Sequence, residues 1–453
     1  MKTFLSHIAE IITNQPFAGD EICVVLPNRR AGLFLKQQLV PSDNKPHWLP
    51  KIIPVEDFVF SVSRLTEPDS ITLLATLYKA YCRVNSNPVS FDNFLNWGAE
   101  ILRDFEETDQ YLTDTQRLFS YIHDAREIDI WKPGEEPTEF EKNYISFFES
   151  LGPLYESFSE MLLEEKMAYQ GLASRVIAEN TEKYLDKLPY NKIIFAGFNA
   201  LTPVQLTIIK YLVSKKRAEI IFDADSYYLD NPSMEAGYFL RKFKNDKALG
   251  TFSRISNEFL NPEKNIFTCG IPGKTGQARI AGSILNTIPP DKHQVTAVVL
   301  ADETMLLPVL NALPGNLDSF NVTMGFPLAQ TPLYALADSI FRLHVNALNS
   351  NNGNPSFYHA DVTAVLQNPY LYNVIDRIRI QRLLTSIKKN NYSYITFREI
   401  LSIASEDNTQ NQEVSTNEKG RNEDLLSTLF TSITSALMLP AIVAEILESI
   451  KNA

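Results

Sequence analysis

The residues with the clearest chemical potential are two adjacent arginines that follow a short apolar run. Ile22–Leu26 has the composition of a buried strand, and Asn28, Arg29 and Arg30 then open a helical pattern that continues through Leu39. Guanidinium groups at a helix start suit a phosphate or another anion, because the backbone N–H groups of the first turn point at the same ligand. We therefore predict a phosphate contact at these three residues. The alternative is an ordinary solvated helix start.

A second candidate contact consists of two aromatic residues, Tyr227 and Tyr228. They come soon after another apolar run, Ile220–Phe222. Aromatic rings at the end of a strand can stack on the bases of a single nucleic-acid strand. The alternative is core packing, which is a common role of aromatic side chains.

These residues need elements that position them, and the sequence predicts a central strand–helix–strand unit. Ile193–Phe195 and Ile220–Phe222 are short apolar runs typical of buried parallel strands. Between them, Thr202 is suited to cap a helix and Pro203 to occupy its first position. Ligands of such α/β units bind at the carboxyl ends of the strands. We therefore expect any chemistry in the loops that follow the two runs.

The same unit resembles a motif of superfamily 1 DNA helicases, in which a strand ends in V-D-E-F-Q-D-T-N-P-x-Q. Phe198, Pro203 and Gln205 match that pattern, whereas Ala196 and Gly197 stand where the helicase has its Asp and Glu. In helicases those carboxylates hold Mg²⁺ and position the water that attacks ATP. Alanine and glycine can do neither. The resemblance thus implies a helicase-like fold in which Ala196, Gly197 and Gln205 are degenerate ATPase positions.

Further motifs resemble the AddB-type subunits of bacterial helicase–nuclease complexes, which belong to the PD-(D/E)XK nuclease family. The matching stretches are V-V-L-P-N-R-R-A-G-L-F-L at 24–35, Leu49–Pro54, and an N-x-x-x-G-x-P-L segment that begins at Asn321 and contains Thr323. In active members a strand and a G-x-x-G-x-G-K-T loop precede the first of these stretches. This sequence begins with the helix that would follow that loop. The resemblance covers most of residues 1–345.

A second glycine-rich stretch only partly matches a phosphate-binding loop. Gly273, Lys274 and Thr275 would end such a loop, but its G-x-x-x-x-G-K-[ST] spacing requires glycine at position 268, which is Thr268. We predict no ATP loop here, with an anion contact as the alternative. The apolar runs Ile266–Cys269 and Val295–Leu300 are instead predicted to be strands of a second α/β domain.

The predicted fold class is α/β, with two helicase-like (RecA-like) parallel-sheet domains and large helical insertions. Apolar residues at three- and four-residue spacing predict helices at 69–84, 90–108, 137–165 and 168–180. The predicted domains are 1–65 with 186–262 for the first helicase-like domain, 66–185 for its helical insertion, 263–345 for an incomplete second helicase-like domain, and 346–453 for another helical insertion with a mobile stretch at 405–424.

The most acidic run of the helical region, Asp104–Asp109, is a possible metal or acid/base pair. No histidine lies near it in the sequence, and we predict an exposed helix end instead. The 6 histidines of the chain are scattered, with no pair at metal-ligand spacing. No metal site is therefore predicted from the sequence.

Composition limits the remaining possibilities. The 453 residues are 44% hydrophobic and 21% charged, as expected of a soluble globular chain with several domains. A net charge of −12 argues against a protein that coats nucleic acid generally, although it allows a local basic groove. The 3 cysteines are far apart, which fits the reducing cytoplasm. No apolar run approaches the roughly 20 residues that span a bilayer, and we expect no membrane partner.

The resemblance implies a non-ATPase, helicase-like module of a nuclease that processes broken DNA ends in double-strand break repair and recombination. The module would guide a DNA strand to a nuclease domain, with an AddA-type helicase–nuclease motor subunit as partner. Its implied substrate is DNA with single-stranded ends, contacted at Asn28, Arg29, Arg30, Tyr227, Tyr228 and Thr323. The competing hypothesis is a protein-interaction scaffold that keeps the helicase fold without DNA binding.

The resemblance also implies that more protein follows these residues. The later helicase motifs and the D…E-x-K constellation of the nuclease do not occur in the sequence. We therefore expect an N-terminal portion of a longer exonuclease, with no enzymatic activity and no cofactor in this span. The Mg²⁺ of the nuclease would bind outside it.

Overall fold

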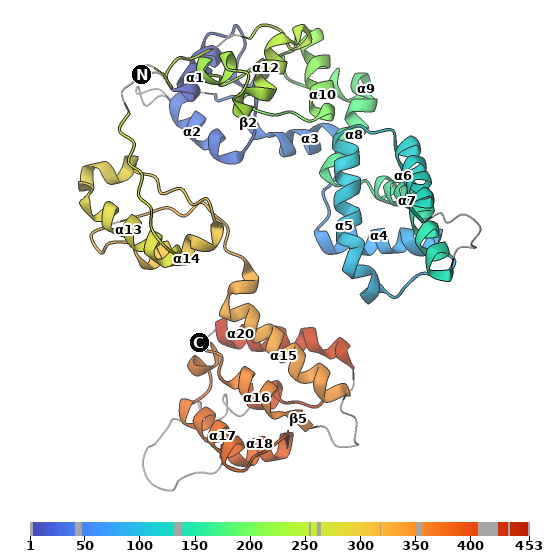
Figure 1. Ribbon diagram of the computed structural model, residues 1–453, viewed down its shortest axis with the longest axis vertical. Coiled ribbons are helices and arrows are strands. Elements are labelled where there is room, and N and C mark those ends of the chain that lie inside the picture. Colours follow the sequence, from blue (N-terminus) through green and yellow to red (C-terminus); the bar gives the residue numbers. More distant parts are fainter. Residues whose placement is uncertain are drawn as a thin grey trace. The chain divides into compact units, whose positions relative to one another are not determined.

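The computed structural model of the chain describes residues 3–40, 48–130, 138–252, 255–260, 264–317, 319–349, 356–405, 425–433 and 435–451. The chain divides into two compact units, Met1–Ile266 and Phe267–Ala453, and each is described by itself (Figure 1). Positions 406–424 of the predicted mobile stretch lie outside the described residues. Among the described helices, none combines the length and hydrophobicity that a bilayer span requires.

The first unit is built on a parallel sheet of four strands in the order β2-β1-β3-β4. Its strands are β1 Ile22–Leu26, β2 Lys51–Pro54, β3 Lys192–Ala196 and β4 Ala218–Ile221. The predicted strands at 22–26, 193–195 and 220–222 are confirmed, and so is the α/β class. Because helices cover both faces, β1 is buried along its whole length, as is typical of a parallel strand.

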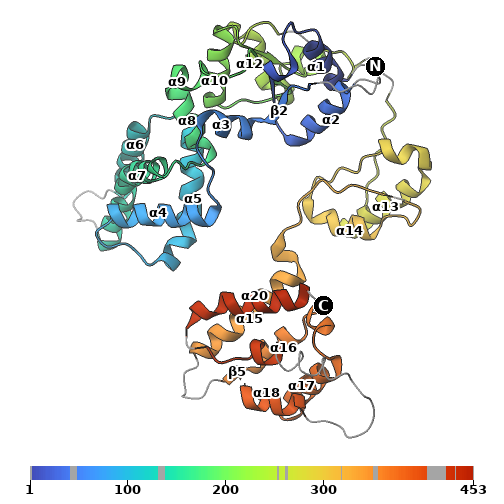
Figure 2. The same ribbon diagram turned by 180° about the vertical axis from the view of Figure 1, so that it is seen from behind.

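Two helix layers cover the sheet. Ile22, Val24 and Leu26 face one layer, and the alternating residues Cys23 and Val25 face the other. The first layer consists of α1 Phe4–Thr13 and α2 Arg29–Leu39, which lie side by side (Figures 1 and 2). The second layer includes α3 Val55–Ser63 and α10 Pro203–Ser214.

A helical insertion leaves the sheet after α3 and returns to it before β3. Its helices are α4 Ser70–Val84, α5 Phe91–Gln110, α6 Thr115–Ile130, α7 Glu139–Glu164, α8 Gln170–Glu179 and α9 Thr181–Leu185. The four predicted helices are confirmed, whereas α6 was not among them. The insertion shares one hydrophobic core with the second face of the sheet, so the two parts form one unit.

The chain after β4 closes the first unit. It forms α11 Ser226–Asp230 and α12 Tyr238–Asn245, with short 3₁₀ turns at Glu235–Gly237 and Lys247–Leu249. The buried side chains of Leu240 and Phe243 attach α12 to the large core. A further 3₁₀ turn, Gly19–Glu21, lies just before β1.

The second unit is mostly helical. Its larger core joins α15 Pro332–Asn349, α16 His359–Leu366, α17 Arg377–Lys389, α18 Phe397–Ser405 and α20 Leu439–Lys451. The antiparallel strands β5 Ser356–Tyr358 and β6 Tyr394–Thr396 pair beside these helices. Further helical elements are α13 Lys274–Thr287, α14 Leu306–Asn311, a helical stretch at 425–429, and 3₁₀ turns at Pro290–Val295, Glu303–Met305, Leu328–Gln330, Leu371–Asn373 and Ala436–Met438.

The prediction of strands at Ile266–Cys269 and Val295–Leu300 is wrong. Both segments are described and form no strand. The side chains of Phe267 and Val299 are 92% and 88% exposed, so these apolar runs are not buried between helices. A short apolar run alone does not show that a neighbouring strand is present to pair with it. Among the described residues of this unit, β5 and β6 are the only paired strands, and they are antiparallel.

Candidate functional site

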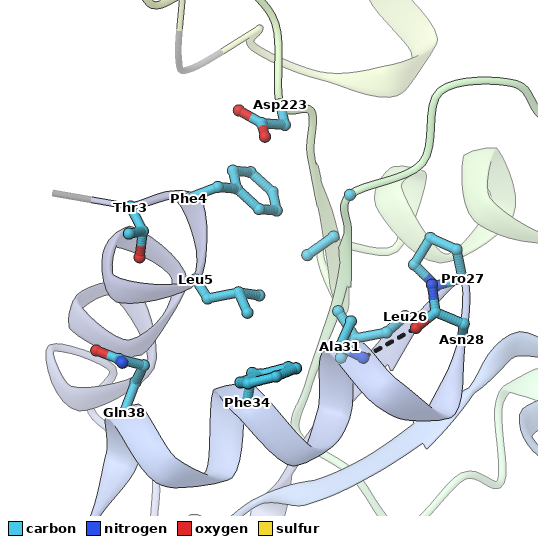
Figure 3. Close-up of a pocket in the computed structure, with 12 residues that line it drawn as sticks. Thr3, Phe4, Leu5, Leu26, Pro27, Asn28, Ala31, Phe34, Gln38 and Asp223 are labelled. Atoms are coloured by element: carbon cyan, nitrogen blue, oxygen red, sulfur yellow. Dashed lines mark hydrogen bonds between the residues drawn. The ribbon is translucent and has the colours of Figure 1, made fainter. Parts of the chain in front are cut away.

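The first unit has a pocket at the carboxyl edge of its sheet. The chain passes from β1 to β2 on one side and places β3 on the other side, so the strand order reverses between β1 and β3. Ligands of open α/β sheets bind at such a reversal. A pocket of about 470 Å³ lies there, lined by Thr3, Phe4, Leu5, Leu26, Pro27, Asn28, Ala31, Phe34, Gln38, Ala196, Gly197 and Asp223 (Figure 3).

The walls of this pocket are largely apolar. Phe4 and Leu5 come from α1, and Phe34 comes from α2 and is 53% exposed (Figure 3). The helices lie here because their apolar stripes pack on the same face of the sheet. Sequence reasoning predicted chemistry at this edge but missed these residues, since nothing in the sequence shows that α1 folds back beside α2.

The polar groups of the pocket already serve local structure. The Asn28 side chain accepts a hydrogen bond from the backbone N–H of Ala31 at 2.9 Å and caps α2 (Figure 3). The Gln38 side-chain oxygen accepts a hydrogen bond from the Ser6 hydroxyl at 3.1 Å. Apolar walls with occupied polar groups suit an uncharged group better than a phosphate.

Two of the three positions predicted to be degenerate ATPase residues, Ala196 and Gly197, line the same pocket. Ala196 is the last residue of β3 and is fully buried. Gly197 follows with φ of +79°, a backbone conformation that side-chain-bearing residues rarely adopt. A Cβ atom on Gly197 would lie 3.3 Å from the ring of Phe4. A carboxylate at position 197 would therefore have a strained backbone and would require the Phe4 ring to shift by a few tenths of an ångström.

Gln205, the third of these positions, has a structural role in its own helix. Its side-chain oxygen accepts a hydrogen bond from the backbone N–H of Thr202 at 3.1 Å. The Thr202 hydroxyl in turn accepts one from the backbone N–H of Gln205 at 3.4 Å. This reciprocal capping box, together with Pro203, starts α10, as the sequence predicted for Thr202 and Pro203.

The two predicted phosphate-binding arginines lie outside the pocket. The Nη2 atom of Arg29 is 2.9 Å from the Oδ1 atom of Asp57 on α3, although the Arg29 side chain is 79% exposed. Arg30 is exposed on the first turn of α2. Of the three predicted residues, only Asn28 lines the pocket. Since Asp57 offsets the charge of Arg29, Arg30 provides most of the positive charge at this helix start.

The predicted stacking residues form an aromatic cluster. Tyr227 and Tyr228 are both half-buried, and their ring centroids lie 4.9 and 5.2 Å from that of Phe259. Phe259 is nearly parallel to Tyr227, with an angle of 25° between the rings. One face of Tyr227 is thus already stacked within the protein.

An arginine fixes the segment that follows this cluster. The guanidinium of Arg241 donates hydrogen bonds of 2.6 to 3.1 Å to four backbone carbonyls, which belong to Tyr228, Asn231, Pro232 and Met234. Carbonyl groups that lack a ladder or helix partner must be satisfied in this way. Arg241 therefore holds the turn between α11 and α12 in one conformation.

The remaining predicted contacts lie in the second unit. Thr323 is exposed in a segment without regular secondary structure. In the Gly273–Thr275 stretch, the Nζ atom of Lys274 is 2.6 Å from Asp302 and donates a hydrogen bond of 2.8 Å to the Thr304 hydroxyl. The hydrogen bond from Lys274 lowers the pKa of Asp302 to about 2. Lys274 thus already has an anionic partner in the chain.

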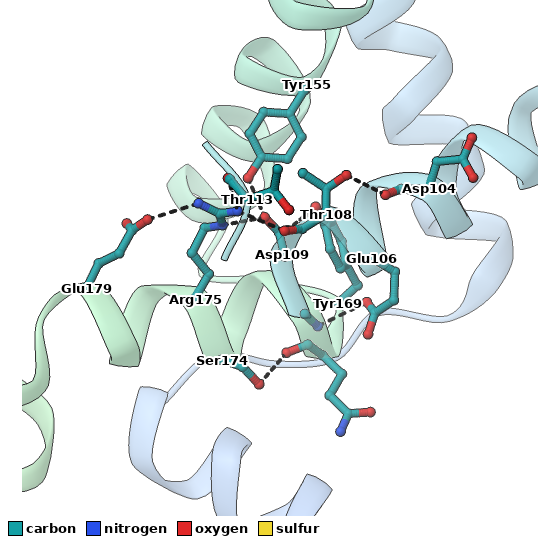
Figure 4. A network of polar contacts seen from close by, with 12 residues as sticks. Asp104, Glu106, Thr108, Asp109, Thr113, Tyr155, Tyr169, Ser174, Arg175 and Glu179 are labelled. Atoms are coloured by element: carbon teal, nitrogen blue, oxygen red, sulfur yellow. Dashed lines mark hydrogen bonds and ion pairs between the residues drawn. The ribbon is translucent and has the colours of Figure 1, made fainter. Parts of the chain in front are cut away.

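The prediction of an exposed helix end at Asp104–Asp109 is wrong for Asp109. Asp104 and Glu107 are exposed, but Asp109 is fully buried at the end of α5. Its carboxylate accepts hydrogen bonds from the hydroxyls of Tyr155 and Tyr169, the latter at 2.6 Å (Figure 4). The three groups come from α5, α7 and the start of α8.

Arg175 completes this buried network. Its Nε atom lies 2.6 Å from the Asp109 Oδ1 atom, as an ion pair whose alignment is not that of a hydrogen bond. Its Nη2 atom donates to the backbone carbonyls of Thr108 and Thr113 at 2.9 and 2.8 Å (Figure 4). Burial raises the pKa of Asp109 above its ordinary value despite these partners. The network joins three helices and lies outside the residues that line the pocket.

One group of side chains among the described residues has the composition of a metal site. The potential ligand atoms of His123, Asp124 and Glu127 on α6 all lie within 4.8 Å of one another. Asp124 and Glu127 are exposed, and the Nδ1 atom of His123 is 3.2 Å from the Asp124 carboxylate. Exposed acidic groups of this kind are common without a metal.

The chemistry of the pocket differs from that of a nucleotide site in two respects. Its walls are largely apolar, and Ala196 and Gly197 offer no carboxylate for a metal ion, which leaves Asp223 as the one acidic residue among the described residues of its lining. The fold nevertheless has a pocket large enough for a ligand at the reversal of strand order. Comparison with known protein families gave no match, and comparison with curated proteins gave none either.

Proposed function

We propose that these residues form a helicase-like module that guides a DNA strand without hydrolysing ATP. The parallel-sheet unit, Met1–Ile266, would be its RecA-like domain. The parent protein would be a nuclease that processes broken DNA ends, with Mg²⁺ in a nuclease domain and an AddA-type motor subunit as partner. DNA with single-stranded ends would be its cytoplasmic substrate.

The observation that carries the proposal is the pocket at the carboxyl edge of the sheet. Its place, at the reversal of strand order between β1 and β3, is where an α/β ATPase would bind its nucleotide. Phe4 lies against Gly197 there, and Ala196 is buried. The place of the pocket, together with the residues at positions 196 and 197, supports descent from a nucleotide-binding protein and a present function other than ATP hydrolysis.

A protein-interaction scaffold is the second candidate, and one surface favours it. Leu33 and Phe34 on α2 are 62% and 53% exposed, and Phe34 borders the pocket. Large apolar side chains that are exposed next to a hollow often bind a partner protein. Such a module would bind no DNA, and its partner would cover α2.

Salt-dependent binding of fluorescent duplex DNA with a single-stranded tail separates the two candidates. The guide predicts binding that weakens steeply with salt, because Lys and Arg side chains displace the counterions of DNA. If Arg29 and Arg30 contribute, the variant Arg29→Ala/Arg30→Ala binds more weakly than the control Lys79→Ala/Lys187→Ala, which removes two exposed charges elsewhere in the unit. Absence of binding by the wild-type chain at low salt would favour the scaffold.

A further inference from the structure

The helix α17 is the most basic element of an otherwise acidic chain. It carries five cationic residues among its thirteen and no acidic residue, namely Arg377, Arg379, Arg382, Lys388 and Lys389. The whole chain has 42 basic and 54 acidic residues. Ile380, Leu383 and Ile387 are buried in the core of the second unit. Because this apolar stripe fixes the rotation of the helix, its polar face must point away from the core.

A groove runs along that polar face. It lies between α16 and α17 and has a volume of about 850 Å³. On α17 it is lined by Gln381, Thr385 and Lys388, which follow one another by about one helical turn. The facing side of α16 contributes Thr363 and Gln367. Figure 2 shows the two helices in the same unit.

A tight turn closes the groove at the end of α17. Asn391 has a φ of +52°, which asparagine tolerates better than most residues. The backbone N–H of Tyr392 then donates a hydrogen bond to the carbonyl of Ile387 at 3.2 Å and ends the helix. Asn391 and Tyr392 thereby line the groove beside Lys388. An amide and an aromatic ring thus lie next to a cation.

None of the described residues that line the groove is acidic. The nearby acidic side chains have other roles. Asp361 is buried and accepts a hydrogen bond from Asn346 at 2.8 Å. Asp376 caps α17 through the backbone N–H of Ile378 at 2.9 Å, and Glu399 accepts a hydrogen bond from the backbone N–H of Thr396 at 2.8 Å.

The cations lie at both ends of the exposed stripe. Arg377 is one turn before Gln381, and its guanidinium lies 5.7 Å from the ring centroid of Tyr372. Lys388 is eleven residues further on, or about 16 Å along the helix axis. Between them the groove offers amide and hydroxyl groups. This arrangement fits an extended phosphate backbone, in which cations contact phosphates and neutral polar groups contact sugars and bases.

We propose that the groove between α16 and α17 binds the phosphate backbone of single-stranded DNA, with Arg377 and Lys388 as phosphate contacts. The inference rests on the proposed function and assigns its strand contact to the second unit. Charge complementarity favours this occupant over a basic peptide, because none of the described lining residues offers it an acidic partner. Arg29, by contrast, already pairs with Asp57.

The test measures binding of a fluorescent single-stranded DNA to the full chain at several salt concentrations. The variant Arg377→Gln/Lys388→Gln removes one charge that lines the groove and one from the exposed stripe beyond its end. The control Lys292→Gln/Lys451→Gln removes two exposed charges elsewhere in the same unit. For the groove variant we expect an affinity about tenfold lower than that of the wild-type chain. The slope of log affinity against log salt concentration should be less negative by about 1.4. The control variant keeps the wild-type slope. Unfolding curves identify any variant that loses its fold.

The variant Arg29→Ala/Arg30→Ala, measured in the same assay, distinguishes a DNA contact in the groove from one at the start of α2. If the wild-type chain binds DNA and only Arg29→Ala/Arg30→Ala weakens it, the groove assignment is overturned while the proposed function stands. Equal weakening in the groove variant and its Lys292/Lys451 control would also overturn the assignment, since it would reflect net charge alone. Absence of wild-type binding at low salt overturns both proposals.

Discussion

The ring of Phe4 lies 3.3 Å from the position that a Cβ atom on Gly197 would occupy. Gly197 also has a φ of +79°, so both the backbone and the surroundings favour glycine. The N-terminal helix α1 thus packs against the position at which a helicase would hold a catalytic carboxylate. The positive φ of Gly197 and the packing of Phe4 thus both disfavour a side chain at this position.

Gly197→Ala should therefore reduce the free energy of unfolding by about 1–3 kcal/mol, since a strained backbone adds to close contact with Phe4. Urea unfolding measures the change. The control is Gly315→Ala, because Gly315 is exposed and a Cβ atom there has open space around it. In a Phe4→Ala background, Gly197→Ala should cost less stability, because the close contact with the ring is gone and only the backbone strain remains. Full stability of Gly197→Ala would contradict the steric argument.

Introducing the two carboxylates of the helicase motif should not produce ATP hydrolysis. The variant Ala196→Asp/Gly197→Glu supplies the two acids, but the pocket still has apolar walls and no phosphate-binding loop. We expect phosphate release from ATP and Mg²⁺ to stay at the level of the wild-type chain. A rise in turnover that depends on both acids would show that the pocket still accepts a nucleotide.

The buried carboxylate of Asp109 should be a major stabilising group of the helical insertion. Asp109→Ala leaves two tyrosine hydroxyls without their acceptor and the Arg175 guanidinium without its buried ion-pair partner, and it should cost about 3–5 kcal/mol. Asp104→Ala, on the exposed side of the same helix, should change stability by less than about 0.5 kcal/mol. Chemical denaturation of both variants tests the difference. Equal effects would mean that burial of Asp109 has no energetic consequence.

The same carboxylate should make stability depend on pH. Burial raises the pKa of Asp109 in the folded state, so the folded state holds this proton more tightly than the unfolded state. The stabilisation that this proton gives to the folded state is fully present below the ordinary carboxyl pKa. It is lost as pH rises through the raised pKa of Asp109. In Asp109→Asn this dependence should disappear from unfolding curves recorded between acidic and neutral pH. A wild-type slope in that variant would assign the effect to other groups.

The turn between α11 and α12 should depend on Arg241. Arg241→Ala removes hydrogen bonds to four carbonyls and should speed proteolytic cleavage within residues 228–237. The control Lys244→Ala, an exposed charge on α12, should leave the rate unchanged. Mass spectrometry of the first cleavage products gives the site. Cleavage elsewhere would show that another segment opens first.

Local signals predicted the central unit well. The apolar runs of β1, β3 and β4 predicted strands, and Thr202 with Pro203 predicted the start of α10. Each of these signals lies within a few consecutive residues. The short strand β2 was not predicted, since Lys51–Pro54 sits at the sheet edge and is not continuously buried. The α/β class was therefore accessible from sequence.

Long-range contacts account for what was missed. The partners of Asp109 are 46 to 66 positions away in the chain, so an acidic run could not reveal its buried member. The pocket forms because α1 packs beside α2, which no local pattern indicates. The runs at 266–269 and 295–300 differ in the opposite direction: their apolar composition predicts burial, but most of their side chains are exposed. The basic composition of α17 was visible in the sequence, but the facing groove was not.

The most direct test of the account is DNA binding by the wild-type chain with and without ATP and Mg²⁺. A fluorescent duplex with a single-stranded tail serves as the probe, and phosphate release is followed in the same samples. A DNA-guiding module without ATPase activity should show binding that weakens steeply with salt, equal affinity with and without ATP, and no DNA-stimulated phosphate release. Absence of DNA binding at low salt, or ATP hydrolysis that rises on adding DNA, would contradict it.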